Sequence, residues 1–209
     1  SCTTYFDKMT EVRSLGKLIK TLLIIVFTVA TITSHATGPP NFVLVYVDDL
    51  GWAETSVEMI KGRADTRSDY FQTPHIARIA KDGMVLSSCY SPSTLCAPSR
   101  NSLLHGMTPS RLRYTVLSSI EAKKQYMGKT TIPKALKKAN PTYRTAHFGK
   151  WHIGSIRADG AASPGNSGFD DWFSSPNFYE NSPLFSHNGQ VIETDGESSH
   201  VTTDLALDW

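Results

Sequence analysis

Apolar runs alternate with amphipathic stretches along the chain. The run NFVLVYV at residues 41–47 is uninterrupted and rich in β-branched side chains, which is typical of a parallel strand buried on both faces. It ends at Asp48-Asp49. We expect a second strand at residues 84–90, MVLSSCY, and a third within residues 143–154, YRTAHFGKWHIG.

Helical signals lie between these runs. Residues 73–83 predict a helix that Thr73 caps and Gly83 ends, and shorter helices are expected at 98–105 and 132–139. The spacing of apolar residues in the first helix predicts its buried stripe: Ile76, Ile79 and Ala80.

Turn signals complete the pattern. Gly, Ser and Pro crowd residues 154–168, which predicts a loop, and Asn188-Gly189 predicts a hairpin turn. The last residues predict the start of a helix with Thr202 or Thr203 as its N-cap. Strands alternating with helices indicate an α/β domain around a mostly parallel sheet flanked by helices. Ligands of such sheets bind outside the carboxyl ends of the strands.

Residues 1–36 predict a leader with a secretory signal peptide whose start is Met9. Basic residues precede an apolar run at 22–32, and the small residues of Ser34-His35-Ala36 follow it. The run is shorter than the roughly 20 residues that cross a bilayer, so we favour a cleaved signal over a membrane anchor. We therefore expect residues 37–209 to be secreted or periplasmic, without stable membrane insertion.

The composition sets further limits. The chain has 209 residues, of which 40% are hydrophobic, and a formal net charge of +2. This length suffices for one domain with a sizeable core. Its basic residues are neither in excess nor clustered, which argues against a nucleic-acid partner.

Cys96 is the first candidate for chemistry. Free thiols are uncommon in exported proteins, so Cys96 either pairs with Cys89 or has another use. It precedes the helix expected at 98–105, whose first amides favour an anionic oxygen, and Arg100 lies one turn further along. A thiolate nucleophile would need a histidine base, for which the chain offers three candidates: His105, His147 and His152.

Two other groups follow expected strands. Asp48 and Asp49 either hold a divalent cation through their oxygens or lie in a solvated loop. Lys150 and His152 share one face if their segment is extended. They either bind an anion and exchange protons, or form a surface lysine and a packed histidine. Three polar groups are thus expected at one edge of the sheet.

Five motifs in order resemble the type I sulfatase family. CAPSR at 96–100, with LLHG after it, is similar to the sulfatase signature. The other four motifs are NFVLVYVDDLGW at 41–52, FGKWHIG at 148–154, GFDDWF at 168–173 and TTDLALDW at 202–209. The resemblance covers roughly residues 41–209 and implies the N-terminal part of an alkaline-phosphatase-like sulfatase domain, truncated at the C-terminus.

The resemblance implies specific roles. A formylglycine-generating enzyme would oxidise Cys96 to Cα-formylglycine. One hydroxyl of the hydrated aldehyde attacks the sulfur of a sulfate monoester, and the other then drives sulfate release. Arg100 would hold the formylglycine hydroxyl, Lys150 the sulfate and His152 the diol. The implied ligands of a divalent cation, usually Ca²⁺ with Mg²⁺ as the alternative, are Asp48, Asp49 and Cys96.

The resemblance also implies a substrate: a sulfated small molecule, aryl or carbohydrate. Two other functions stay open, namely a phosphonate or phosphate ester hydrolase of the same superfamily and an exported binding module with an unmodified cysteine. The family's later Asp-Asn metal pair, second histidine and second lysine have no counterpart before Trp209. We therefore expect these 209 residues alone to bind the cation weakly and to be inactive.

Overall fold

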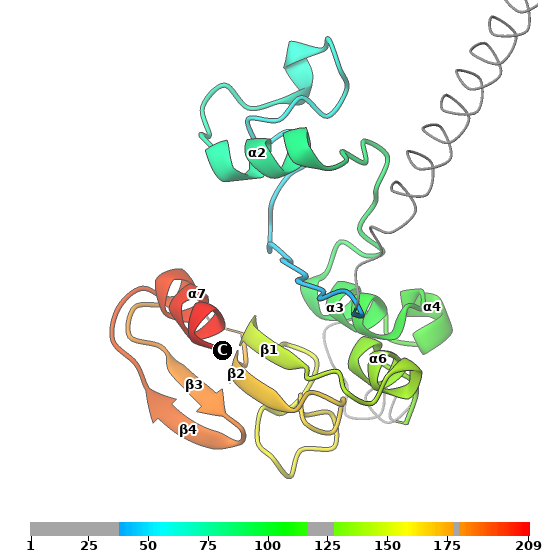
Figure 1. Cartoon of the computed structure of the whole chain (residues 1–209), viewed down its shortest axis with the longest axis vertical. Coiled ribbons are helices and arrows are strands. Elements are labelled where there is room, and N and C mark those ends of the chain that lie inside the picture. Colours follow the sequence, from blue (N-terminus) through cyan, green and yellow to red (C-terminus); the bar gives the residue numbers. More distant parts are fainter. Residues whose placement is uncertain (1–37, 117–127, 178–179) are drawn as a thin grey trace, which may run out of the picture. The chain divides into compact units, whose positions relative to one another are not determined.

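The computed structural model describes residues 38–116, 128–177 and 180–209 (Figure 1). The expected leader and signal peptide lie outside the described residues. The chain divides into two units, Ser1–Val47 and Asp48–Trp209. The described part of the first unit is extended and exposed, and all the helices and strands below belong to the second.

The sheet has four strands in the order β1-β2-β3-β4 (Figure 1). Strand β1 (Ala146–Lys150) pairs in parallel with β2 (Asp171–Ser175). Strands β3 (Leu184–His187) and β4 (Gln190–Glu193) extend the sheet in antiparallel fashion. In the described part of the chain the sheet is therefore mixed, with its parallel pair at the β1 edge.

The hairpin predicted at Asn188-Gly189 is confirmed, because these two residues connect β3 and β4. Both have positive φ, 51° and 93°, as a two-residue hairpin turn with right-handed strand twist requires.

The three predicted helices are confirmed within two residues at each end. They are α2 (Pro74–Asp82), α3 (Cys96–His105) and α6 (Ile132–Ala139). Gly106 ends α3 in the left-handed conformation, and its N–H donates to the Leu103 carbonyl.

Three further helices complete the described part of the chain. The 3₁₀ helix η1 (Ala64–Thr66) and α4 (Pro109–Leu112) are short. Helix α7 (Ser198–Asp208) packs on β1. The expectation that Thr202 or Thr203 caps this helix is wrong, because the Glu197 carboxylate accepts the first free amides and starts α7 earlier.

Two expected strands are absent from the described residues. Residues 41–47 and 84–90 contain no strand, and no described strand pairs with either run. Their large apolar side chains lie exposed, up to 90% at Val43. An extended segment becomes a strand only when a neighbour completes its backbone hydrogen bonds, and an apolar run alone does not provide that neighbour.

The buried stripe expected on α2 is also wrong. No residue of α2 is buried, and Ile79 is 70% exposed. The periodicity predicts which residues form the apolar side of the helix, but nothing in the described chain covers that side.

One hydrophobic core lies beside the end of β1. It joins side chains of α3, of α4 and the short segment after it, and of the segment after β1: Ala97, Leu104, Leu112, Tyr114, Trp151, Ile153 and Ala162. This core holds the first turn of α3 and the end of β1 in one compact unit.

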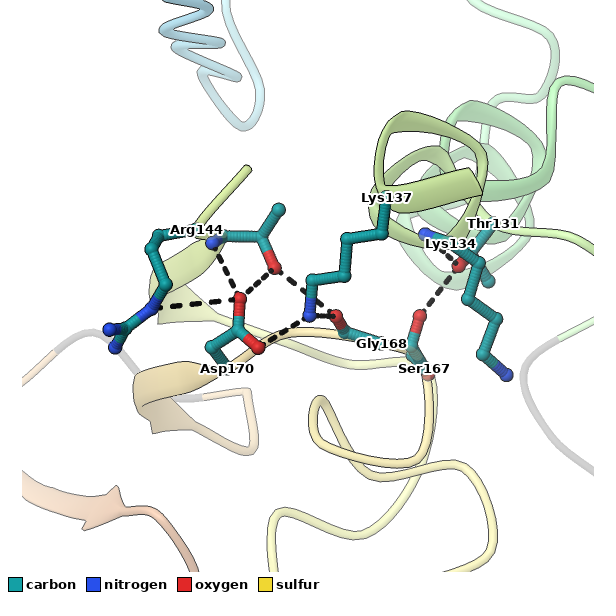
Figure 2. A network of polar contacts seen from close by, with 8 residues as sticks. Thr131, Lys134, Lys137, Arg144, Ser167, Gly168 and Asp170 are labelled. Atoms are coloured by element: carbon teal, nitrogen blue, oxygen red, sulfur yellow. Dashed lines mark hydrogen bonds and ion pairs between the residues drawn. The ribbon is translucent and has the colours of Figure 1, made fainter. Parts of the chain in front are cut away.

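A polar network ties α6 to the loop before β2 (Figure 2). Lys137 Nζ donates to the Gly168 carbonyl at 2.7 Å and to Asp170 Oδ1 at 2.5 Å, and Thr131 Oγ1 donates to the Ser167 carbonyl. Thr145, just before β1, donates its backbone N–H to Asp170 Oδ2 at 2.8 Å. Asp170 therefore connects three segments that lead into the parallel strand pair.

None of the helices in the described residues is long and apolar enough to cross a membrane.

Candidate active site

Asp48, Arg100 and Lys150 form a charged cluster, the Asp48 cluster. Arg100 Nη2 lies 3.0 Å from Asp48 Oδ1, and Lys150 Nζ lies 2.6 Å from Asp48 Oδ2. The three side chains are only 10%, 8% and 13% exposed for Arg100, Lys150 and Asp48. Two cations and one anion thus meet in a poorly hydrated place, where electrostatic interactions are stronger than in water.

Arg100 also links α3 to the end of β1. Its Nη1 donates to the Lys150 backbone carbonyl at 2.7 Å. Arg100 lies one turn after Cys96, the first residue of α3. Of the three groups expected to converge, the ion pairs bring Asp48 to Lys150 and to Arg100, although the segment before Asp48 is not a strand. The place of Cys96 beside them stays a prediction.

The backbone after β1 continues along β2. Trp151 N donates to the Ser175 carbonyl at 2.9 Å, and His152 N donates to the Pro176 carbonyl at 3.0 Å. The Trp151 side chain lies in the core, where its Nε1 donates to the Ala162 carbonyl. These bonds fix the chain directly after Lys150.

Lys150 and His152 do not share the face of an extended segment, so that expectation is wrong. His152 has φ = 50°, in the left-handed region, and Gly149 has φ = 89°. Gly149 still pairs within β1, which ends at Lys150, and the chain turns at His152. His152 is half-buried beside Pro176 and belongs to this turn.

Cys96 is a free, half-buried thiol, and Cys89 is a free, exposed one. The alternative of a Cys89–Cys96 disulfide is therefore wrong for this structure. Leu95, at the N-cap of α3, makes no side-chain cap hydrogen bond.

The loop before α3 is shaped by serines. Ser99 is buried, and its Oγ donates to the Ser93 carbonyl at 2.8 Å and lies 3.1 Å from Ser91 Oγ. These contacts fold residues 91–95 back over the first turn of α3 and set the position of Cys96.

Asp49 differs from its neighbour. It is exposed and has φ = 52°, whereas both carboxylate oxygens of Asp48 contact cations. The described residues contain no group of three or more acidic, histidine or cysteine side chains arranged to hold a metal ion. Asp48, Asp49 and Cys96 alone cannot complete a Ca²⁺ shell, which takes six to eight oxygen ligands.

Two of the histidines considered as bases for Cys96 have other partners. Burial lowers the pKa of His105, and its Nδ1 contacts the Asn101 carbonyl at 2.9 Å. Burial, with the positive charge of Arg100, lowers the pKa of His147 to about 3. Its Nδ1 lies 2.7 Å from Ser174 Oγ. Both rings are therefore neutral near pH 7.

A cavity of about 300 Å³ opens near the end of β2. Ser175 and Pro176 form part of its wall, and their carbonyls bind the backbone of Trp151 and His152. Most of its lining is apolar, with one carboxylate: Ile156, Ser175, Pro176, Glu180, Pro183, Leu184, Phe185 and Val191. A volume of this order accommodates a small ligand or one sugar ring.

The comparisons with known proteins identify the family. The profile of the Sulfatase family matches residues 40–209, which is most of the chain. The chain belongs to the sulfatase family. It is 34% identical to N-acetylgalactosamine-6-sulfatase of Mus musculus over 166 residues, which cover 75% of the chain and 29% of that protein. It is 29% identical to arylsulfatase A of Homo sapiens over 145 residues, covering 69% and 27%.

Solved structures show the same fold. BT4656 in complex with its substrate D-glucosamine-2-N,6-O-disulfate matches with a TM-score of 0.57 and 27% identity, over 75% of this chain and 29% of that one. Ps i-CgsB matches with a TM-score of 0.61 and 22% identity, over 77% and 39%. The predicted alkaline-phosphatase-like sulfatase fold is confirmed. This sulfatase chain spans less than a third of the length of the curated relatives named here.

Two features of the site were not expected from the sequence. One is Asp48 as the shared partner of two cations, and the other is the contact of His147 with Ser174. The second had a visible signal, because His147 stands within a strand pattern, three residues before Lys150, where an aliphatic side chain would be ordinary.

Proposed function

We propose that the protein containing this sulfatase segment hydrolyses sulfate monoesters. The observation that carries the proposal is the Asp48 cluster, in which Arg100 and Lys150 converge beside the helix that begins with Cys96. Two poorly hydrated cations provide fixed positive charge for the sulfuryl oxygens, whose charge grows as the ester bond breaks.

Each residue of the site has a role in this proposal. Cys96, once converted to Cα-formylglycine by a formylglycine-generating enzyme, would supply after hydration one hydroxyl that attacks sulfur as the ester S–O bond breaks and the alcohol leaves. The second hydroxyl would then lose its proton, expel sulfate and restore the aldehyde. Arg100 holds the attacking hydroxyl from one turn along α3, Lys150 binds the sulfate, and His152 contacts the diol. Arg100 and Lys150 are preorganised for this, because their contacts with Asp48 and the backbone fix them before substrate arrives.

The divalent cation stays a prediction from the sequence. Asp48 and Asp49 are its proposed ligands together with modified Cys96, and further oxygens from residues outside the described set are required to fill a Ca²⁺ or Mg²⁺ shell.

The proposed substrate is a sulfated carbohydrate. Similarity to an N-acetylgalactosamine-6-sulfatase, and to BT4656 with its glucosamine disulfate, supports a sulfated amino sugar. The cavity near His152 suits an organic group attached to the ester, because its apolar walls and Glu180 match the faces and hydroxyls of a sugar ring. An aryl sulfate is the second candidate, supported by similarity to arylsulfatase A. Secretion or periplasmic export, directed by the predicted leader, belongs to the same proposal.

The test uses the full-length gene product, produced together with a formylglycine-generating enzyme. We expect hydrolysis of 6-O-sulfated N-acetylhexosamine, weaker hydrolysis of an aryl sulfate, and peptide mass spectrometry that finds an aldehyde at position 96. Cys96→Ala should lower kcat/KM by roughly 10³-fold or more. Cys89→Ala is the matched control, since Cys89 is exposed and free, and should leave the rate unchanged.

Two results would overturn the proposal. One is faster turnover of the matched aryl phosphate, which identifies a phosphate ester hydrolase. The other is an unmodified thiol at position 96 with no hydrolysis of any ester, which identifies a binding protein.

A further inference from the structure

His147 lies close to the Asp48 cluster, because its ring bonds to the Lys150 backbone and feels the charge of Arg100, but it is not part of the cluster. It is the second residue of β1 and is opposite Trp172 of β2 in the parallel register. Its Nδ1 lies 2.7 Å from the Oγ of Ser174, a residue with no exposed surface. A buried hydroxyl that lost this partner would carry the full cost of an unsatisfied polar group, so the contact holds β1 and β2 together on this face.

The ring of His147 also packs against two aromatic side chains. Its centroid lies 4.9 Å from that of Trp151 and 5.6 Å from that of Phe169, both in edge-to-face geometry. Trp151 and Phe169 contact each other at 6.0 Å. Trp151 directly follows Lys150, the last residue of β1. The contact between the imidazole and the Trp151 ring therefore holds the chain in place just after Lys150.

The imidazole is uncharged in these surroundings. Burial is the main cause that lowers its pKa to about 3, and the positive charge of Arg100 acts in the same direction. A hydrogen bond with the backbone of Lys150 acts in the opposite direction. The carbonyl of Lys150 is also the acceptor for Arg100 Nη1. A neutral polar ring can therefore lie close to Arg100 and the Lys150 backbone without repelling the two cations.

We propose that His147 is a positioning residue for the Asp48 cluster. Its hydrogen bond with Ser174 and its packing against Trp151 fix the end of β1, and this fixes where Lys150 reaches Asp48 and where Arg100 meets the Lys150 carbonyl. The effect on catalysis rests on the proposed sulfate ester hydrolysis, whereas the effect on the position of Lys150 does not.

The test compares three variants of the formylglycine-containing, full-length protein. His147→Leu keeps the side-chain volume but removes the hydrogen bond, and we expect kcat/KM to fall about 10²-fold, the usual effect of a displacement near 1 Å. His147→Asn places an amide where Nδ1 lies, so it should recover most of that loss. His187→Asn, on β3 of the same sheet, is the control and should match wild type.

Two readouts distinguish positioning from a general loss of structure. The inhibition constant of inorganic sulfate should rise about tenfold in His147→Leu, alongside the fall in kcat/KM. The fraction of Cys96 converted to formylglycine should stay unchanged. A crystal structure of the variant should show a longer Lys150 Nζ to Asp48 distance. Ser174→Ala removes the same hydrogen bond at a smaller change in volume, and it takes the place of His147→Leu if that variant does not fold.

The inference is wrong if His147→Leu binds sulfate as wild type does and keeps the Lys150–Asp48 contact. It is also wrong if His147→Asn loses as much as His147→Leu, since the hydrogen bond then has no part in the effect. If wild type hydrolyses no sulfate ester, the proposed function fails, and the Lys150–Asp48 distance in the variant still decides the role of His147.

Discussion

Asp48 and Asp49 are neighbours in the sequence with unlike surroundings. The sequence treats them as one acidic pair, yet Asp48 lies between Arg100 and Lys150 and Asp49 is exposed. Removing one member of a mostly buried ion pair leaves the other charge without compensation, which costs much more than losing an exposed charge. At the scale of single residues, we therefore expect substitutions of the two aspartates to affect stability differently.

We expect Asp48→Asn to lower the free energy of unfolding by about 3 kcal/mol, because Arg100 and Lys150 lose their shared anion. Asp49→Asn is the matched control and should change it by less than about 0.5 kcal/mol, since asparagine tolerates the left-handed backbone there. Urea denaturation of the intact protein measures both. Equal losses in the two variants would contradict the arrangement described for Asp48.

At the scale of elements, local signals were reliable and pairing was not. Helices α3 and α6 were predicted because caps and stop residues such as Gly106 lie within the segment that they define. Strand β2, residues 171–175, was not predicted, because five residues carry little periodicity and its partner β1 lies more than 20 residues earlier. The strand predicted at residues 41–47 is absent for the converse reason. The apolar run is easy to recognise locally, but it does not specify which strand it would pair with.

The Asp170 network makes a prediction about pH. Burial acts to raise the pKa of Asp170, but hydrogen bonds from Lys137 and Thr145 outweigh it and hold the pKa below its ordinary value. A depressed carboxyl pKa stabilises the fold above the unfolded-state pKa of about 4, and this stability is lost as the pH falls through the lower, folded-state value.

We therefore expect Asp170→Asn to reduce the free energy of unfolding by about 1 kcal/mol at pH 7, a value discounted for the partial exposure of the pair. The difference from wild type should shrink as the pH falls below about 4. Asp159→Asn is the control: Asp159 pairs with Arg157 at an exposed place, so the substitution should have no effect. A loss that is independent of pH would show that the charge of Asp170 does not act as described.

At the scale of the whole molecule, the described chain leaves much apolar surface in water. Val43 and Val45 are 90% and 78% exposed, and the apolar side of α2 is uncovered. Large apolar side chains are normally covered by other protein, so their exposure in each unit marks surface open to further contacts. The motifs identified the family, but local patterns could not show which surfaces stay uncovered, because that depends on contacts remote in sequence.

We expect these 209 residues, produced alone, to bind a hydrophobic dye such as ANS strongly. Replacing Val43 and Val45 by lysine should reduce the dye fluorescence, whereas Gln72→Lys, at an exposed polar position, should not. Fluorescence as low as that of a well-packed globular protein would contradict the exposure of these side chains.

The shared carboxylate of Asp48 has a consequence for ligand binding. An anion that approaches Arg100 and Lys150 meets a resident counter-ion that already satisfies both, so it binds only as tightly as it competes with Asp48. Anything that draws Asp48 away from Arg100 and Lys150, a divalent cation included, leaves their charges free for an anion and so strengthens anion binding. By reciprocity, the bound anion strengthens cation binding by the same free energy. If the proposed cation binds at Asp48, its binding and that of sulfate would therefore be thermodynamically coupled.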